Sequence, residues 1–266
     1  MTTIKQTILL AFISVIGLTS CGQAQKNEVR NDFKKYYDQF SVQGSFILYD
    51  QQNDKYTFYN QEQTKQSFTP ASTFKICNSL IGLETGVIGD ENFVITWDSV
   101  VRQNSKWNQD HDLKTAFKNS TVWYYQELAR RVGGQQMKLW LDKANYGNAD
   151  TSGGIDKFWL TGGLLITPQQ QIDFLVKLRN NKLPFSQRSM DIVKKIMIEK
   201  DTLDYVIRGK SGWGAKEDIG WFVGYIEIGE NVYYFANCIQ ATDFNKANAR
   251  RDIVYLILDD LKLTKK

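Results

Sequence analysis

Runs of apolar and alternating residues near the two ends of this chain predict β-strands. Residues 44–50 and 55–59 are rich in aromatic and branched side chains and flank a short polar turn, which predicts a hairpin. Residues 219–228 and 232–239 alternate around a second turn that contains glycine and asparagine, which predicts another hairpin. A further strand-like run covers residues 205–212. The predicted strands therefore belong to the N-terminal and C-terminal parts of the sequence.

Apolar residues recur at helical spacing through the middle of the chain and at its end. One predicted helix runs from Thr69 to about Gly86 and has Ile76, Leu80 and Leu83 on one face. The other helices are predicted at residues 113–118, 123–132, 135–143, 168–178, from 191 onward, and at 249–261. The predicted fold class is α+β: terminal strands pair into one antiparallel sheet with flanking helices, and a mostly helical middle, from about residue 90 to 181, is inserted as a lobe.

The composition supports a folded chain and restricts its chemistry. With 266 residues, 42% of them hydrophobic and 13% aromatic, the sequence allows one large domain or two interleaved lobes around a sizeable core. The net charge of +4 is weak and evenly spread, which argues against a nucleic-acid partner. His111 is the one histidine, so zinc sites that need several histidines are excluded and no metal site is expected. Its polar surroundings predict a surface position.

The N-terminus has the pattern of an export signal. Lys5 precedes an apolar run over residues 8–18 that is too short to remain as a membrane-spanning helix. The sequence Leu-Thr-Ser-Cys-Gly that follows, with Cys21 and Gly22, resembles the bacterial lipoprotein signal, in which the chain is cut before an acylated cysteine. An ordinary signal peptide with a chance cysteine is the alternative.

This pattern predicts three parts of the chain and a location. The expected parts are a cleaved lipoprotein signal peptide at residues 1–20, a polar tether at 21–34 and a folded domain at 35–266. Lipid at Cys21 is then the sole membrane contact, since acyl chains on one residue anchor a soluble domain. Gly22 does not resemble the inner-membrane retention signal, so we expect an exported, periplasmic protein on the outer membrane.

Two cysteines remain once Cys21 is assigned to lipid. Export permits a disulfide between Cys77 and Cys238. Cys77 falls on the helix predicted after Thr69 and Cys238 in a predicted strand. We expect two buried thiols with no assigned chemistry, and a disulfide remains the alternative.

The start of the first predicted helix has the residues of an activated nucleophile. Thr69 suits the N-cap and Pro70 the first helical position. Ser72 and Lys75 are three residues apart and so share a face at the first turn. A serine hydroxyl needs a base, and a lysine serves as one only when burial or modification discharges it. A capped helix with a solvated lysine is the common alternative for such a pair.

Later segments supply the other parts that acyl transfer requires. Ser120 places a hydroxyl at a turn that opens a predicted helix, and we prefer it to Ser99, which has the same Ser-x-Val context. Lys210-Ser211-Gly212 ends a predicted edge strand, where a lysine and a hydroxyl can face a carboxylate. A lysine that protects an exposed edge strand is the alternative.

Two further segments are less specific on their own. Tyr146-Gly147-Asn148 has the composition of a turn. Trp159 lies in an apolar loop, where its indole N–H needs a partner if the ring is buried.

In this order the segments resemble those of the class D β-lactamases, or oxacillinases. The resemblance covers nearly everything after residue 35. It rests on Pro70-Ala71-Ser72-Thr73-Phe74-Lys75, Ser120-Thr121-Val122, Tyr146-Gly147-Asn148, Phe158-Trp159-Leu160, Lys210-Ser211-Gly212 and Asp218-Ile219-Gly220-Trp221-Phe222-Val223-Gly224. It implies the serine β-lactamase and penicillin-binding-protein fold for the domain at 35–266.

The resemblance implies a role for each catalytic residue. Ser72 is the acylated nucleophile, and Lys75, N-carboxylated by CO₂, is the base in acylation and deacylation. A carbamate forms only from the neutral amine, so it demands an apolar pocket, which includes Val122 and Trp159. Trp159 donates a hydrogen bond to the carbamate, and Ser120 carries a proton toward the β-lactam nitrogen.

The resemblance also implies how the substrate is held. Lys210, Ser211 and Gly212 with one C-terminal arginine bind the substrate carboxylate. Arg250 and Arg251 are adjacent and only one can face the cleft; alignment with the family's helix favours Arg250.

The resemblance also implies which backbone groups stabilise the oxyanion and which residues support the site. The oxyanion donors are the backbone N–H groups of Ser72 and Trp213, and Tyr146, Gly147 and Asn148 support the wall of the site.

The implied activity is hydrolysis of penicillins, oxacillin-type and related β-lactams, which confers antibiotic resistance and needs no cofactor besides CO₂ or bicarbonate. A β-lactam sensor or penicillin-binding protein that stays acylated is the nearest rival, and a non-catalytic binding lipoprotein is a rival from another class. A Ser-His-Asp hydrolase is disfavoured because residues 209–213 lack the final glycine of a nucleophile elbow. The polar surface pattern shows no obvious seam, which leaves both a monomer and a dimer open.

Overall fold

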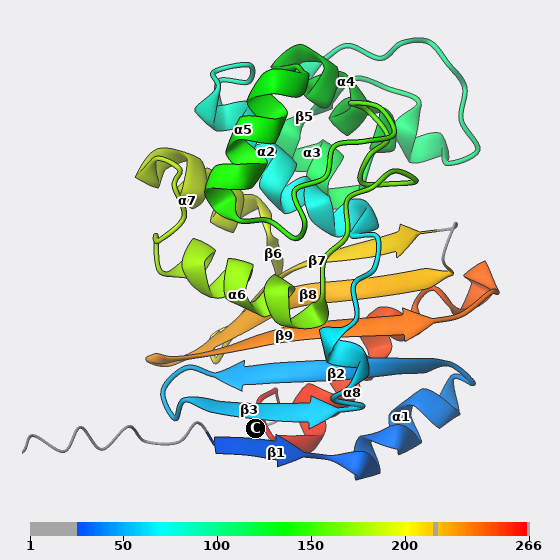
Figure 1. Cartoon of the computed structure of the whole chain (residues 1–266), viewed down its shortest axis with the longest axis vertical. Coiled ribbons are helices and arrows are strands. Elements are labelled where there is room, and N and C mark those ends of the chain that lie inside the picture. Colours follow the sequence, from blue (N-terminus) through cyan, green and yellow to red (C-terminus); the bar gives the residue numbers. More distant parts are fainter. Residues whose placement is uncertain (1–25, 215–217, 265–266) are drawn as a thin grey trace, which may run out of the picture.

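The computed structural model describes residues 26–214 and 218–264, and its centre is one sheet built from both ends of the chain (Figure 1). The strand order is β1-β3-β2-β9-β8-β7-β6. The strands are β1 (Lys26–Val29), β2 (Gln43–Asp50), β3 (Lys55–Tyr59), β6 (Ile198–Asp201), β7 (Val206–Gly214), β8 (Ile219–Ile228) and β9 (Asn231–Gln240). Both predicted hairpins are present, as β2–β3 and β8–β9, and the pairing of β2 with β9 joins the two ends of the chain.

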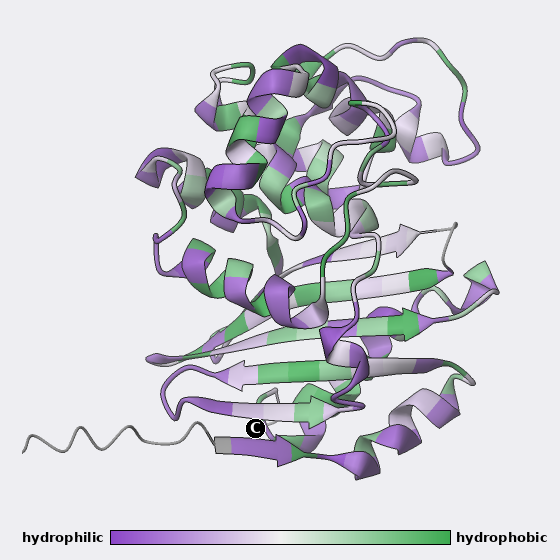
Figure 2. Cartoon of the chain, viewed as in Figure 1, coloured by the Kyte–Doolittle hydropathy of each residue, from purple (hydrophilic) through white to green (hydrophobic). Residues whose placement is uncertain are grey.

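Helices cover both faces of the sheet. On one face α1 (Lys34–Gln39) and α8 (Ala249–Asp260) pack over a cluster that includes Phe46, Phe235 and Ile253. On the other face α6 (Pro168–Arg179) lies across β2, β8 and β9. Successive side chains of β2 point to opposite faces of the sheet. Phe46 therefore belongs to the cluster under α1 and α8, and Ile47 to the hydrophobic cluster on the α6 face. Figure 2 shows the resulting concentration of hydrophobic residues along the central strands.

A helical lobe lies beyond the α6 face of the sheet, as Figure 1 shows. It contains α2 (Lys75–Glu84), α3 (Leu113–Lys118), α4 (Val122–Val132), α5 (Gly134–Ala144) and α7 (Gln187–Ile196). Helix α2 is the centre of the lobe: residues 75–83 are all buried, and it packs against α4 and α7. The predicted α+β architecture with an inserted lobe is confirmed.

Several details of the prediction are wrong. The middle of the chain is not all helical, because β4 (Val94–Ile95) and β5 (His111–Asp112) form a second small sheet. These strands are too short to show a periodicity. Helix α6 belongs to the main sheet's cover rather than to the lobe, and edge strand β6 was not predicted because all four of its residues are exposed. The sheet is also mixed, since β1 runs parallel to β3.

The predicted boundary of the tether is wrong as well. Residues 26–29 form β1, and a 3₁₀ turn at Asn31–Phe33 leads into α1. Phe33 is fully buried under the sheet. The polar composition of this segment hid its role, since an edge strand is held largely by backbone hydrogen bonds. The signal peptide and Cys21 lie outside the described residues.

Local sequence explains where α6 begins. Thr167 Oγ1 accepts from the Gln170 backbone N–H at 3.0 Å, and Gln170 Oε1 accepts from the Thr167 N–H at 3.0 Å. Pro168 occupies the first helical position, where its missing N–H removes no hydrogen bond. This capping box fixes the end of the loop that precedes α6.

Two other features concern export. Cys77 and Cys238 are buried thiols and are not joined in a disulfide. Over residues 26–214 and 218–264, none of the helices combines the length and the apolar character that a bilayer span requires.

Candidate active site

Ser72 lies in a tight turn at the N-terminal end of the central helix. The turn is a 3₁₀ helix over Ala71–Phe74, and the α-helix proper begins at Lys75. The predicted cap at Thr69 is wrong, because Pro70 is the N-cap residue and no side chain caps the turn. Ala71 has φ +49°, a left-handed conformation that is strained for alanine and raises Ser72 toward the surface of the lobe.

Lys75 is buried directly behind the serine. Its Nζ and Ser72 Oγ are hydrogen bonded at 2.6 Å, and Lys75 is 0% exposed. Burial lowers the pKa of Lys75 well below its usual value, and the positive charge of Lys210 lowers it further. Burial therefore favours the neutral amine, which is the form that accepts a proton.

Aromatic rings form the walls around this amine. Tyr125 presents its ring 5.3 Å from Lys75 Nζ, and Phe74 packs against Trp159 with 5.3 Å between ring centroids. Trp159 is fully buried, and its Nε1–H has no hydrogen-bond partner among the described residues. A buried donor without a partner is costly. A neutral buried amine together with this vacant donor fits a carbamate on Lys75.

The loop that carries Trp159 is held by Gly147 and Asn148. Asn148 Nδ2 donates to the Gly163 carbonyl at 2.8 Å, and Asn148 Oδ1 accepts from the Leu165 N–H at 3.0 Å. Gly147 has φ +55°, and a Cβ there would lie 2.1 Å from the Leu165 carbonyl oxygen. Tyr146 packs on Phe74 at 5.6 Å between ring centroids. This placement agrees with the supporting role expected for residues 146–148.

A cavity of about 320 Å³ opens in front of Ser72. It is lined by Ser72, Asn104, Trp107, Asn119, Ser120, Val122, Ser211, Gly212, Trp213, Phe244 and Arg250. Ser120 has φ +53° at the residue before the α4 cap, which exposes its hydroxyl side to the cavity. Ser99, the alternative to Ser120, is exposed and does not line the cavity.

Strand β7 forms the wall opposite Ser120. A Cβ at Gly212 would lie 3.2 Å from the Ser72 nitrogen and 3.1 Å from the Pro70 carbonyl oxygen, so a side chain there would require the neighbouring backbone to shift. Trp213, the next residue of β7, lines the same cavity as Ser72. The Trp213 ring packs edge-on against Phe244 at 5.5 Å between centroids.

The two C-terminal arginines differ in their surroundings. Arg250 lines the cavity, lies 6.0 Å from the Trp213 ring, and donates from Nη1 to the Ala247 carbonyl, while its Nε has no partner among the described residues. Arg251 forms an ion pair with Glu199 at 2.6 Å, outside the cavity. The geometry therefore agrees with the expectation that Arg250 faces the cleft.

Lys210 is 3% exposed and lies behind the cavity wall. Its Nζ donates to the Ser211 carbonyl at 3.0 Å and lies 5.5 Å from the Phe117 ring. Burial lowers the pKa of Lys210 to about 7; Arg250 and Arg251 lower it, whereas Glu199 raises it. A bound carboxylate would favour its charged form.

The comparisons with known proteins agree with this geometry. Residues 32–259 match the penicillin binding protein transpeptidase domain. A probable β-lactamase, YbxI of Bacillus subtilis, is 42% identical over 230 residues, which cover 86% of this chain and 84% of that protein. The crystal structure of a class D β-lactamase, YbXI from Nostoc, is 46% identical with a TM-score of 0.85, covering 87% of this chain and 98% of that one.

The chain belongs to the class D β-lactamase family. It is also similar to a regulatory protein, BlaR1 of Bacillus licheniformis, at 35% identity over 231 residues that cover 86% of this chain and 38% of that protein.

Some residues of this class D site were missed or misplaced by sequence reasoning. Asn104 and Phe244 line the cavity from loops that carry no motif. The prediction of a surface position for His111 is wrong, since it is 1% exposed. Its Nε2 lies 3.0 Å from the Lys106 carbonyl oxygen, so it ties the loop before α3. In the described part of the chain, no group of three or more His, Cys, Asp or Glu residues is placed to hold a metal ion.

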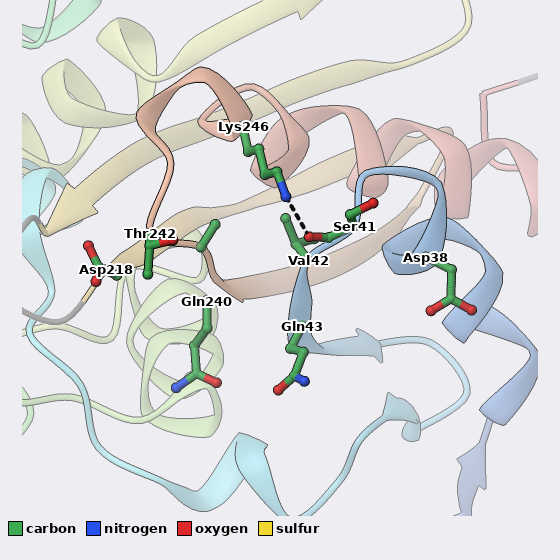
Figure 3. A pocket seen from close by; sticks show the side chains of 9 residues that line it. Asp38, Ser41, Val42, Gln43, Asp218, Gln240, Thr242 and Lys246 are labelled. Carbon is green, nitrogen blue, oxygen red and sulfur yellow. Dashed lines mark hydrogen bonds between the residues drawn. The ribbon is translucent and has the colours of Figure 1, made fainter.

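A larger cavity of about 550 Å³ lies outside the class D site (Figure 3). It also contains a serine and a lysine, Ser41 and Lys246. There, however, Lys246 Nζ donates to the Ser41 carbonyl oxygen at 2.9 Å and not to the hydroxyl. This pair therefore has no activated nucleophile, which makes Lys246 a useful control.

Proposed function

We propose that this protein hydrolyses β-lactam antibiotics through an acyl-enzyme on Ser72 and so confers resistance to them. The observation that carries the proposal is the 2.6 Å hydrogen bond between Ser72 Oγ and the fully buried Lys75 Nζ. Membership of the class D β-lactamase family supports it.

In acylation, Ser72 Oγ attacks the lactam carbonyl carbon, and the hydroxyl proton of Ser72 passes to the base at Lys75. The backbone N–H groups of Ser72 and Trp213 stabilise the oxyanion, which Gly212 supports by its close approach to the Ser72 nitrogen. The lactam C–N bond then breaks; Ser120 donates its hydroxyl proton to the leaving nitrogen and receives in return the proton that the base at Lys75 took from Ser72. The product of this half-reaction is an ester on Ser72.

In deacylation, water attacks the ester and Ser72 leaves with a proton. A carbamate on Lys75, formed from the neutral amine and CO₂ with loss of one proton, supplies a base for both half-reactions. Trp159 would donate its vacant Nε1–H to that group, and Val122, which lines the cavity, would help to shield it. Removing the N–H partner would favour the return of the free amine.

Binding of the substrate carboxylate is assigned to Lys210, Ser211 and Arg250. Ser211 and Arg250 line the cavity, and Lys210 lies next to Ser211. Arginine and lysine together form a charge-assisted clamp for a carboxylate. We extend the proposal to export and to a lipid anchor at Cys21 on the periplasmic side of the outer membrane, which the sequence of residues 1–22 supports.

A second candidate function is a β-lactam sensor that stays acylated, and the 35% identity to BlaR1 favours it. Both candidates acylate Ser72 and differ in deacylation.

Turnover of a chromogenic cephalosporin by the purified chain, with and without bicarbonate, tests the two candidates. We expect many turnovers for each enzyme molecule and a faster or better sustained rate with bicarbonate. A burst of about one equivalent without turnover would indicate the sensor. Absence of any acyl-Ser72 by mass spectrometry would contradict both and favour a binding lipoprotein.

A further inference from the structure

Carboxylates among the described residues act on the positive charges around the cleft: Glu199 acts on Lys210 and Arg251, and Asp252 acts on Arg250. Arg250 and Arg251 from α8 lower the pKa of Lys210, and Glu199 from β6 raises it. The charge of Lys210 in turn lowers the pKa of Lys75 at the start of α2. Glu199 is also the carboxylate that binds Arg251, through Nη2–Oε2 at 2.6 Å and Nη1–Oε1 at 3.3 Å. A two-point contact of this kind fixes the orientation of the guanidinium plane.

The position of Glu199 in the sheet explains why its side chain reaches α8. Ile198 pairs with Arg208 and Lys200 pairs with Ile207, so Glu199 is an extra residue between two successive pairs of β6 and β7. Such a bulge turns a side chain out of the regular alternation and commonly occurs beside active sites. Here it lies on the edge strand next to the strand that carries Lys210.

Neither Glu199 nor Arg251 touches the space in which substrate binds. Both line a separate cavity of about 530 Å³ between α3, α7 and β6, which shares no lining residue with the cavity in front of Ser72. The connection is indirect: Phe117 lines the separate cavity and its ring contacts Lys210 Nζ at 5.5 Å. The ion pair therefore stands behind the carboxylate clamp.

We propose that Glu199 is a positioning residue for substrate binding, which holds Arg251 away from the cleft and balances the charge of the clamp formed by Lys210 and Arg250. The role rests on the proposed β-lactamase function. Because burial and two arginines lower the pKa of Lys210, the carboxylate of Glu199, which raises that pKa, increases the fraction of Lys210 that is charged near pH 7.

The test is the pH profile of kcat/KM for an anionic chromogenic cephalosporin in two variants of the same ion pair. Lys210 has a pKa of about 7, so kcat/KM is expected to fall as pH rises through that region and Lys210 loses its proton. Glu199→Gln removes the charge that favours the ammonium, so the alkaline limb moves to lower pH. Arg251→Met removes a charge that disfavours it, so the limb moves to higher pH.

Each shift is expected to be about 0.5–1 pH unit, the effect of one charge at close range in a partly screened medium. The Glu199→Gln, Arg251→Met double variant should return the limb close to its original position. The loss in Glu199→Gln should fall on KM several times more than on kcat, and should disappear with the uncharged methyl ester of the same substrate.

Glu28→Gln is the control, because Glu28 forms an ion pair with Lys55 between β1 and β3, at the opposite edge of the sheet. A purely structural ion pair would make both single variants worse in the same direction, and that result, or unchanged limbs, would overturn the role. Absence of turnover by the unaltered chain would instead overturn the proposed function together with it.

Discussion

At the scale of single residues, the chemistry depends on one amine that is kept out of water. Lys75 is 0% exposed, and no carboxylate among the described residues raises its pKa, so burial acts against its charge without compensation. A lysine in this state is unfavourable for stability and is explained by its 2.6 Å contact with Ser72 Oγ. Trp159, whose ring packs against Phe74, has an Nε1–H with no hydrogen-bond partner among the described residues, which supports the same proposed function.

Lys75→Ala tests the amine as base. We expect kcat to fall by at least about 10³-fold, the upper part of the range for loss of a general base, and any acyl-enzyme that forms to persist. Mass spectrometry of Ser72 after mixing with a penicillin measures this. Lys246→Ala is the control, because Lys246 Nζ donates a hydrogen bond to the backbone carbonyl of Ser41 and not to its hydroxyl. Full turnover by Lys75→Ala would refute the assignment.

Trp159→Phe tests the donor while it keeps an apolar ring. A hydrogen bond to a charged group contributes about 1.5–3 kcal/mol, so CO₂ retention on Lys75 should weaken about 10- to 100-fold. Labelled bicarbonate with carbon NMR reports the carbamate directly, and added bicarbonate should restore activity. Trp140→Phe, in the ring pair with Phe185, serves as the control. Equal retention in the two variants would contradict the role of Trp159.

At the scale of elements, three separate segments meet at Ser72. The 3₁₀ turn and the first residue of α2 carry Ser72 and Lys75, the proposed nucleophile and base. The turn before α4 carries Ser120, and β7 carries Gly212 and Trp213. The long loop between α5 and α6 carries Trp159, the proposed donor to the carbamate, and is held by hydrogen bonds from Asn148 to Gly163 and Leu165.

Gly147→Ala tests the loop. Its φ of +55° and the 2.1 Å approach to the Leu165 carbonyl oxygen leave no room for a Cβ, so the free energy of unfolding should fall by about 2 kcal/mol or more. Urea denaturation measures the loss, and CO₂ retention should fall with it. Gly229→Ala, at φ +57° with no atom near its Cβ, should cost only about 1 kcal/mol. Equal losses at the two positions would show that the close approach is relieved easily.

At the scale of the whole molecule, the sheet and the lobe share one core. Strand β2 pairs along its whole length with β9, from Gln43 with Gln240 to Asp50 with Tyr233. The cavity in front of Ser72 is lined by Ser72 and Ser120 on the lobe side and by Gly212 of β7, so it lies where the two parts meet. The proposed catalysis at Ser72 therefore depends on contacts between residues that are far apart along the chain.

The sequence by itself determined the long elements and the motifs. Regular periodicity predicted α3 at residues 113–118 without error, and both hairpins, because amphipathic segments of this length leave a clear pattern. Short or exposed strands such as β1, β4 and β6 leave no such pattern and were missed.

Only the tertiary structure decided which charges face one another. The sequence shows Ser72, Lys75, Lys210 and Arg250 as residue types, but burial in the folded chain lowers the pKa of Lys75 well below its usual value and brings that of Lys210 to about 7. The folded chain also places Arg250 in the lining of the cavity and pairs Arg251 with Glu199, a residue that belongs to no recognised motif. Solvation and Coulomb energies depend on distances in space, and adjacent residues in a sequence do not carry that information.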